Sequence, residues 1–542
     1  MSSGPNQTAI GSGRVKNAVI FVAVSILLAQ FAWRADNSLR QKSPVWDEFL
    51  HVDYGVNLLL RGPEFEAKDH PYPAASLLAF PLLFSRSDQE IASGHPVEME
   101  NPRNLMGPRR MNVGVATLCL LLFSLWVSRR FGSLTGILTL AVGCLDPNWL
   151  AQSRFITTDI ALAAGFALGT AAIVEHAEKR EARMMVLAIF GLLLALCSKF
   201  SGFLLIPSAF LIYVFVGRKK NPEKAWSHCL ASSLYPTALI ALIGGTAYLL
   251  LFEISGLLAS AEPGRGIHHL SKGIQHFMEV RSGGHGTFLL GSYHENGSLL
   301  YFPILILSKT PVALLGICIL APLLPDSRRS ITSVGRLWVA PLLYLSVAIL
   351  SHVNLGFRHL TPIFPFLWLF CALALRPLTT QLDGGRWKAG LLLAVLALES
   401  VLAHPHYLPF TNSAFGGQEA AHTVAVDSAS DWGQDLPALK NYLNAHPPKK
   451  GPIHLSYFGT GDPRKFGISF VWRSCGPLGF QKPRLNESAP SDAPAEVLAI
   501  SATCLRGVTG GDSQDNSYAW LRSREPETIL GGSILVFRDI VP

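Results

Sequence analysis

The sequence predicts a mainly α, polytopic membrane protein that carries a small α/β domain at its C-terminal end. Of its 542 residues, 49% are hydrophobic and only 15% are charged, and the mean hydropathy is +0.32. A soluble protein of this length carries more charge, so the composition indicates a chain that lies largely in a bilayer. After His404 the composition changes, and Pro, Gly, Asp and Ser become more frequent.

About eleven segments reach the length of a membrane helix, about 20 apolar residues with their flanks. They are residues 17–33, 111–128, 133–150, 158–175, 184–198, 200–216, 230–253, 299–323, 337–351, 360–376 and 386–403. The segment 72–84 is shorter and contains Pro73 and Pro81, so we expect it to lie along the interface or to re-enter.

Basic clusters predict the orientation, because Lys and Arg are strongly biased toward short cytoplasmic loops. The clusters are Arg129-Arg130, Lys179-Arg180 with Arg183, Arg218-Lys219-Lys220, Arg328-Arg329, and Arg386 with Lys388. All of them fall inside if the N-terminus is inside and segment 72–84 does not cross. We therefore expect a multi-pass protein of the cytoplasmic (inner) membrane with its C-terminal domain outside. This bias also explains the net charge of +8, and since the sequence holds no nucleic-acid motif, we expect no nucleic-acid partner.

Three parts follow from this topology: a cytoplasmic tail of residues 1–16, a membrane domain of residues 17–403, and an external α/β domain of residues 404–542. The membrane domain has long external loops at 34–110 and 254–298. In the α/β domain, strands are expected at residues 423–427, 453–458, 496–502 and 533–538, and helices at 436–444 and 518–524. Cys475 and Cys504 both lie there, as a candidate disulfide or as two free thiols.

Ionisable residues outside the basic clusters gather at the outer ends of the predicted spans. They are Asp47, Glu48, Asp146, Arg154, Asp159, Lys199, His285, Arg358 and His359, and Lys309 lies somewhat deeper. An ionisable group at membrane depth is costly, so each of these is a candidate functional residue.

Asp47 and Glu48 follow the first span directly. Adjacent residues on a helix diverge by about 100°, so only one of the two is expected to face a substrate. Asp47 and His51 are four residues apart and share one helix face. The alternative interpretation is a solvated turn at the membrane surface, in which Asp47 caps a helix.

The other candidates also leave two interpretations open. Asp146 and Asp159 flank a turn and can act at a site or cap helices, but capping does not explain Arg154 between them. The cations Lys199, Lys309 and Arg358, with His359, can bind a phosphate or snorkel to lipid headgroups. His285 stands among glycines, which indicates either a close approach of the backbone to a ligand or a flexible loop.

Together, these residues form motifs that resemble a known group. The motifs are Trp46-Asp-Glu48, His70-Pro-Tyr-Pro73, Ser153-Arg-Phe-Ile-Thr-Thr-Asp159, Ser198-Lys-Phe-Ser-Gly202, Tyr301-Phe-Pro303 to Lys309-Thr-Pro311 and Phe357-Arg-His-Leu-Thr-Pro362. Their order resembles the multi-spanning GT-C glycosyltransferases of the dolichyl-phosphate-mannose protein mannosyltransferase type. The tail motifs Asp427-Ser-Ala-Ser-Asp-Trp-Gly-Gln-Asp435 and Tyr457-Phe-Gly-Thr-Gly-Asp462 are similar to those of a bacterial branch.

This resemblance implies an inverting transfer of a hexose or pentose from a polyprenyl-phosphate donor to an extracytoplasmic protein, lipid or polysaccharide. By analogy with the family, Asp47 is the catalytic base, with Glu48 beside it. Arg154 and Lys199 hold the donor phosphate, with Lys309, Arg358 and His359 as further candidates. Asp146, Asp159 and His285 are assigned to the acceptor or substrate.

Some features of the family do not carry over. His70-Pro-Tyr-Pro73 departs from the usual pair of adjacent prolines, and the 254–298 loop is too short for the MIR-type domain of the protein mannosyltransferases. Metal dependence is open, since some GT-C enzymes use a divalent cation such as Mg²⁺ or Mn²⁺. Asp47, Asp146 and Asp159 could bind one if they converge.

Two other classes of protein are alternative interpretations of a chain with many spans and buried charges: a transporter of lipid-linked sugars and a non-catalytic membrane assembly subunit. Transporters tend to show repeated halves and charges near the midplane. This sequence shows unequal loops, no internal repeat and charges at the outer ends of the spans, which favours the enzyme.

Overall fold

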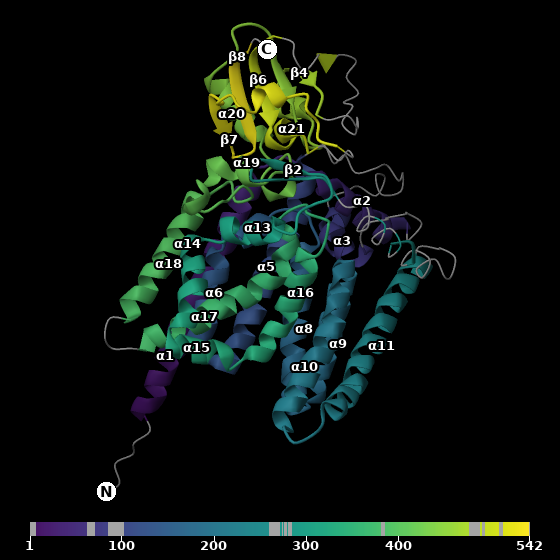
Figure 1. The fold of residues 1–542 in the computed structure, drawn as a ribbon, viewed down its shortest axis with the longest axis vertical. Coiled ribbons are helices and arrows are strands. Elements are labelled where there is room, and N and C mark those ends of the chain that lie inside the picture. The colour runs from purple at the N-terminus through teal and green to yellow at the C-terminus, as the bar shows by residue number, and fades with distance from the viewer. Residues whose placement is uncertain are drawn as a thin grey trace.

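The computed structural model describes residues 7–61, 71–84, 102–258, 271–273, 275, 279, 285–380, 385–475, 488–489, 494–508 and 513–540. The loops 34–110 and 254–298 therefore lie partly outside the described residues, and His70 lies wholly outside them. A helical bundle forms most of the molecule, and a sheet lies at one end of it, far from the N-terminus (Figure 1).

The bundle is built from helices of very different length. They are α1 (Gln7–Leu39), α2 (Trp46–Arg61), α3 (Tyr72–Ala79), α5 (Pro102–Phe131), α6 (Ser133–Leu145), α7 (Pro147–Ser153), α8 (Asp159–Lys179), α9 (Ala182–Ser198), α10 (Leu205–Lys220), α11 (Trp226–Leu258), α13 (Tyr301–Lys309), α14 (Val312–Leu320), α15 (Pro325–Thr332), α16 (Val339–Ile349), α17 (Phe364–Thr380) and α18 (Gly385–Leu402).

In the described part of the chain, six helices are long and apolar enough to cross a membrane, or up to nine spans if each of three bent helix pairs counts once. The bent pairs are α6 with α7, α13 with α14, and α15 with α16. The two remaining expected segments coincide with α9 and α18. The prediction of a mainly α, multi-pass membrane protein is confirmed. Residues 73–84 form a shorter apolar helix, as their length indicates.

Helix α8 lies in the middle of the bundle, with 94% of its apolar stretch buried. It packs closely on α9, because glycines remove side chains at the contact. A Cβ on Gly165 would lie 2.6 Å from Ala195 N, and one on Gly191 would lie 2.4 Å from Gly169 Cα. Small residues allow helix backbones in a membrane to approach in this way. This contact fixes the start of α8, where Asp159 lies.

The C-terminal domain contains a six-stranded mixed sheet in the order β5-β4-β3-β6-β8-β7. The strands are β3 (Ile453–Ser456), β4 (Phe470–Arg473), β5 (Ser488–Ala489), β6 (Ala495–Ser501), β7 (Thr528–Leu530) and β8 (Ile534–Ile540), with helices α19 (Ala421–Val424), α20 (Leu436–Ala445) and α21 (Ala502–Arg506). Strands β3 to β6 pair in parallel, and β8 pairs antiparallel with β6 and β7. The predicted α/β domain is confirmed, as is the disulfide between Cys475 and Cys504.

Two local predictions in this domain are wrong. Residues 423–427 are not a strand, because Ala421–Val424 form a helical turn and Asp427 has a positive φ of 56° that ends any extended run. Residues 518–524 contain only the short 3₁₀ turn Ala519–Leu521 instead of a helix. The sequence also gave no signal for the hairpin β1 (Thr287–Leu289) and β2 (Ser292–His294), which meets Ala425 through Leu289.

Candidate active site

Glu48 fixes the start of α2 in place. Arg109 Nε donates to its Oε1 at 2.8 Å and Arg109 Nη2 to its Oε2 at 2.6 Å, and both side chains are fully buried. The backbone N–H groups of Val45 and Ile156 donate to the same carboxylate at 3.0 Å each. Glu48 is therefore saturated with partners, and its neighbour Asp47 points in a different direction, about 100° around the helix.

Asp47 belongs to a buried network of two acids and two cations. Arg358, on the 3₁₀ helix η5 (Phe357–Ile363), donates through Nη1 to Asp47 Oδ2 at 2.6 Å, and the same Nη1 lies 4.0 Å from Asp159 Oδ2. Lys199, directly after α9, donates to Asp159 Oδ1 at 2.5 Å. We call these four residues the outer charge network.

The members of the outer charge network differ in exposure. The side chain of Asp159 is 1% exposed and that of Arg358 is 6% exposed, whereas Lys199 and Asp47 reach 12% and 14%. Buried charges persist only where they are paired, so the network is held together by its own ion pairs. Asp47 and Lys199 are the two members that retain the most access to solvent.

Histidines surround the network. His51 lies one turn after Asp47, and burial lowers the pKa of His51 to about 4, so its imidazole is neutral at neutral pH. His359 follows Arg358 directly and is close enough to Lys199 and Asp159 for electrostatic contact. His285 is half-buried and lies near both His359 and Asp427. The predicted candidates His359 and His285 are thus near the outer charge network.

A loop of the C-terminal domain completes this region. Trp432 places its ring 4.3 Å from Arg358 Cζ and meets Phe155 edge to face at 6.1 Å. Asp427 lies in the electrostatic field of His285 and Arg358, and burial raises the pKa of its carboxyl. The motif from Asp427 to Asp435 was visible in the sequence, but nothing local in it pointed to a contact with Arg358.

The same loop is anchored on the chain segment that precedes Asp47. Lys42 donates to Asp435 Oδ1 at 2.5 Å, and both side chains are fully buried. Ser43 adds two bonds, from its N–H to Gln434 O at 3.0 Å and from its hydroxyl to Gly433 O at 2.8 Å. These contacts fix the C-terminal domain against the entrance to α2.

Two buried polar atoms of the network have no hydrogen-bond partner among the described residues: Asp159 Oδ2 and Arg358 Nε. A buried donor on a guanidinium is normally satisfied, because leaving it unpaired costs about 1 to 3 kcal/mol or more. An oxygen of an anionic ligand would satisfy Arg358 Nε, and such charge-assisted bonds to phosphate are strong.

Arg154 lies apart from the network. Its guanidinium lies between the rings of Phe155, at 4.7 Å, and Tyr407, at 5.6 Å. It donates to Ser38 Oγ at 2.5 Å and to Pro405 O at 2.8 Å. Within the described residues it makes no contact with Asp47, Lys199 or Arg358, so the expected grouping of Arg154 with Lys199 is not found.

Two further candidates have structural partners. Lys309 Nζ donates to the backbone carbonyls of Leu408, Phe410 and Ala429 at 2.9, 3.0 and 2.5 Å, which uses all three of its protons. Asp146 caps α7 by accepting from Asn148 N at 2.9 Å and also accepts from Trp368 Nε1 at 3.0 Å. Capping, one of the two interpretations from the sequence, accounts for Asp146.

Metal binding was left open by the sequence. In the ranges that the structure describes, no three His, Cys, Asp or Glu side chains are grouped so that they could hold a metal ion. Arg358 Nη1 lies between Asp47 and Asp159 and is close to both carboxylates, whereas Asp146 is bonded to Asn148 and Trp368. The three acids therefore do not converge on one point.

Comparison with known proteins gives one family match and several similar folds. Residues 23–256 match the family model described as dolichyl-phosphate-mannose-protein mannosyltransferase. No curated protein sequence matches the chain.

The solved structures that resemble the chain include ArnT from Cupriavidus metallidurans in the apo state, with 14% identity, a TM-score of 0.47, and coverage of 97% of this chain and 98% of that one. The same protein bound to undecaprenyl phosphate gives 13% identity, a TM-score of 0.48, and coverage of 96% and 98%. The S. cerevisiae protein O-mannosyltransferase Pmt1-Pmt2 complex bound to the sugar donor gives 14% identity, a TM-score of 0.36, and coverage of 52% and 42%.

The family match begins in α1 and ends in α11, so it includes Asp47, Asp159 and Lys199 of the outer charge network. The resemblance inferred from the motifs is confirmed: over residues 23–256 the chain is similar to the dolichyl-phosphate-mannose-protein mannosyltransferases, a family of membrane glycosyltransferases.

Proposed function

We propose that this protein transfers a sugar from a polyprenyl-phosphate donor to an acceptor outside the cytoplasm, with Asp47 as the general base. The observation that carries the proposal is the outer charge network, in which Asp47, Arg358, Asp159 and Lys199 form one chain of ion pairs. The family name supports the donor class, since dolichyl-phosphate-mannose is a polyprenyl-phosphate sugar.

The proposed reaction needs a base and positive charge near one carbon. An acceptor hydroxyl attacks the anomeric carbon, its proton passes to the Asp47 carboxylate, and the new glycosidic bond forms as the bond to the phosphate oxygen breaks. The phosphate leaves with the bonding electrons, and Arg358 and Lys199 stabilise its charge. A positioned base contributes on the order of 10²- to 10⁴-fold, and one electrostatic donor about 2.7 to 4 kcal/mol.

Donor binding would also release the base. Arg358 Nη1 donates to Asp47, and Lys199 donates to Asp159. A phosphate oxygen that binds Arg358 competes with the Asp47 carboxylate, because both are anions at one guanidinium. Asp47 then becomes available to accept a proton, at the moment when the reacting carbon is in place.

The C-terminal domain belongs to this site in the proposal. The Trp432 ring lies against the guanidinium of Arg358, whose Nε has no partner among the described residues and could donate to a phosphate. A cation on an aromatic face gains about 2 kcal/mol where water is excluded. Asp427 adds a second acid near His285 and Arg358, on the side of the external loops.

The proposed orientation places the outer charge network and the C-terminal domain outside the cytoplasm. Its support is that the basic clusters lie at the ends of α5, α8 and α10, in α15 and at the start of α18. The α10–α11 connection lies at the end of the bundle away from the C-terminal domain (Figure 1). Arg130 and Arg336 both pair with Glu178 at that end. The same bias of Lys and Arg supports the proposed orientation, and the cytoplasmic (inner) membrane stays part of the proposal.

The experiment that tests the function begins with the lipid-linked sugar that copurifies with the protein. Purified protein in proteoliposomes should consume this lipid and release polyprenyl phosphate. If the lipid moves between leaflets but keeps its sugar, the protein is a transporter and the proposal fails. The divalent cation, Mg²⁺ or Mn²⁺, stays a proposal, and loss of turnover with a chelator, restored by added metal, would support it.

A further inference from the structure

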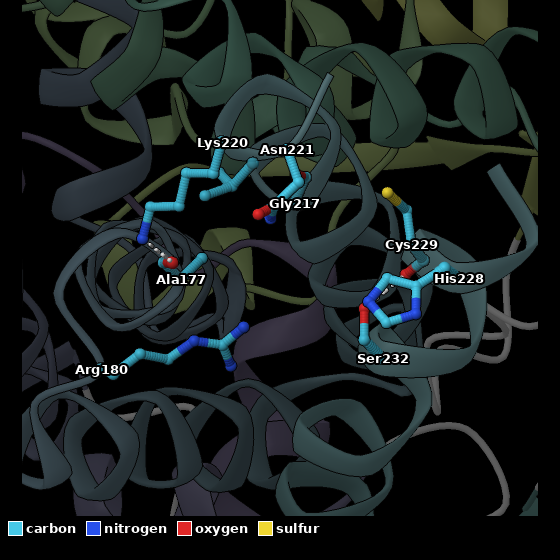
Figure 2. A pocket seen from close by; sticks show the side chains of 9 residues that line it. Ala177, Arg180, Gly217, Lys220, Asn221, His228, Cys229 and Ser232 are labelled. Carbon is cyan, nitrogen blue, oxygen red and sulfur yellow. Dashed lines mark hydrogen bonds between the residues drawn. The ribbon is translucent and has the colours of Figure 1, made fainter. Parts of the chain in front are cut away.

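A polar cavity lies at the opposite end of the bundle from the C-terminal domain. It has a volume of about 310 Å³ and is enclosed by the last turns of α8 and α10 and the first turns of α11. Figure 2 shows Arg180 and Lys220 on one side of this space and His228, Cys229 and Ser232 on the other. We call it the α8–α10–α11 cavity.

The lining of the cavity fits an anion. Five of its nine residues carry side-chain hydrogen-bond donors, namely Arg180, Lys220, Asn221, His228 and Ser232, and none of the nine is Asp or Glu. The first turns of a helix also carry partial positive charge, and α11 presents its first turns to this space. The last turns of α8 and α10 bring backbone carbonyls to the same end, and Lys220 donates to two of these on α8. The charged side chains in the lining are therefore all basic.

The cations of this cavity differ from several basic residues nearby that are paired with acids. Arg130, Lys179, Arg183 and Arg336 all have carboxylate partners. Arg180 and Lys220, by contrast, form no ion pair with any described residue. A general bias of basic residues toward the cytoplasm explains the number of cations at this end, but it does not explain why two cations without an ion pair meet in one cavity whose lining holds no carboxylate.

Both unpaired cations are held in position. Lys220 Nζ donates to the carbonyls of Ala177, at 3.2 Å, and Glu178 at the end of α8. Arg180 lies 5.6 Å from the centre of the Tyr213 ring, and its backbone is left-handed with a φ of 60°. A left-handed conformation is sparsely populated by residues other than glycine. It turns the chain at the end of α8 so that the guanidinium reaches the cavity.

We propose that the α8–α10–α11 cavity binds the phosphate of an anionic glycerophospholipid. The occupant is a lipid rather than a soluble anion because apolar residues around the cavity face outward. Trp226 is 53% exposed and Leu234 60% exposed on α11, and only 28% of the apolar stretch of α11 is buried. A phosphate in the cavity would let its acyl chains lie along this face, as in other basic pockets between membrane helices.

This proposal is independent of the proposed reaction, because it uses no residue of the outer charge network. Its physical consequence is that the bound lipid would link α11 to α8 and α10, since the lining residues come from all three helices. Anionic lipid should therefore raise the thermal stability of the protein, whether or not the protein has transferase activity.

The test measures lipid binding to the full-length protein by native mass spectrometry. Phosphatidylglycerol should bind at least about tenfold more tightly than phosphatidylcholine. Arg180→Gln should lower phosphatidylglycerol affinity by about tenfold or more, because it removes a charge-assisted hydrogen bond. Arg183→Gln is the matched control, since Arg183 is nearby but pairs with Glu181 and does not line the cavity. It should leave affinity unchanged.

A second variant, Ser232→Leu, fills the cavity without removing a charge and should also lower affinity. The unliganded melting temperature of each variant shows that it is folded. Wild-type affinity in both Arg180→Gln and Ser232→Leu would overturn the proposal. Inorganic phosphate that binds by the Arg180-dependent route and displaces phosphatidylglycerol at equal concentration would identify a site for soluble anions, and would overturn it too.

Discussion

Replacing Asp47 by Asn gives two effects of different kind if the proposed mechanism is correct. The change keeps the size of the side chain and an oxygen for Arg358 Nη1, which lies 2.6 Å away. It removes the carboxylate that would accept the proton, so turnover should fall by about 10²- to 10⁴-fold. Binding of polyprenyl phosphate should stay equal or become tighter, because Arg358 loses the anion that competes with the phosphate.

The assay pairs sugar transfer in proteoliposomes with equilibrium binding of undecaprenyl phosphate to the same preparation. Asp36→Asn is the matched control, because Asp36 lies near the end of α1, shortly before Asp47 in the chain, but pairs with the exposed Arg40 and Arg110. It should change neither quantity. Near-normal transfer by Asp47→Asn would remove Asp47 as the base. Loss of undecaprenyl phosphate binding in Asp47→Asn would instead show that the carboxylate organises the site and does not compete with the ligand.

Three further predictions separate the residues of the site. Lys199→Gln should weaken undecaprenyl phosphate binding by about 10- to 100-fold, because a charge-assisted bond is lost. Arg154→Gln should leave this binding unchanged. Equal losses in both variants would contradict the separation of the two cations. Trp432→Leu should weaken undecaprenyl phosphate binding by about tenfold or more, because the Trp432 ring packs on Arg358. Trp432→Phe should restore this binding. A change in turnover without a change in binding would argue against a role of Trp432 in holding Arg358. Burial raises the pKa of Asp431 to about 7. Between about pH 4 and pH 7 the folded state therefore holds a proton that the unfolded state has lost. In this range the free energy of unfolding should fall by about 1.4 kcal/mol for each unit of rising pH. Asp431→Asn should flatten this slope in thermal melts of the C-terminal domain in the full-length protein, and an identical slope in the variant would refute the assignment.

The proposed site also explains why Glu48 is an acid although it is not the base. Its carboxylate accepts four hydrogen bonds, two from Arg109 and two from the backbone at Val45 and Ile156. Removing one partner of such a buried pair leaves an uncompensated charge, which costs about 3 to 5 kcal/mol. Adjacent acids at the start of α2 thus divide into one that holds the helix in place and one that faces the network.

The sequence by itself determined the elements that depend on local pattern. Apolar length predicted the helical segments, of which six, or up to nine, are long and apolar enough to cross a membrane in the described part of the chain. Alternation with turn residues predicted β3, β6 and β8, and amphipathic spacing predicted α20. These signals are local, because a membrane helix or a strand is selected by the hydrophobicity and spacing of its own residues. Position at the first external turn also marked Asp47 as a candidate, before any partner was known.

Only the tertiary structure decided which charges meet. Asp47 and Arg358 are 311 residues apart, and Arg154, close in sequence to Asp159, turns instead to Ser38 and Tyr407. Trp432 reaches Arg358 only because Lys42 and Ser43 hold its loop. Hydrophobicity is a property of each segment, whereas the partner of a buried charge depends on how distant helices pack, and that packing is a property of the whole chain.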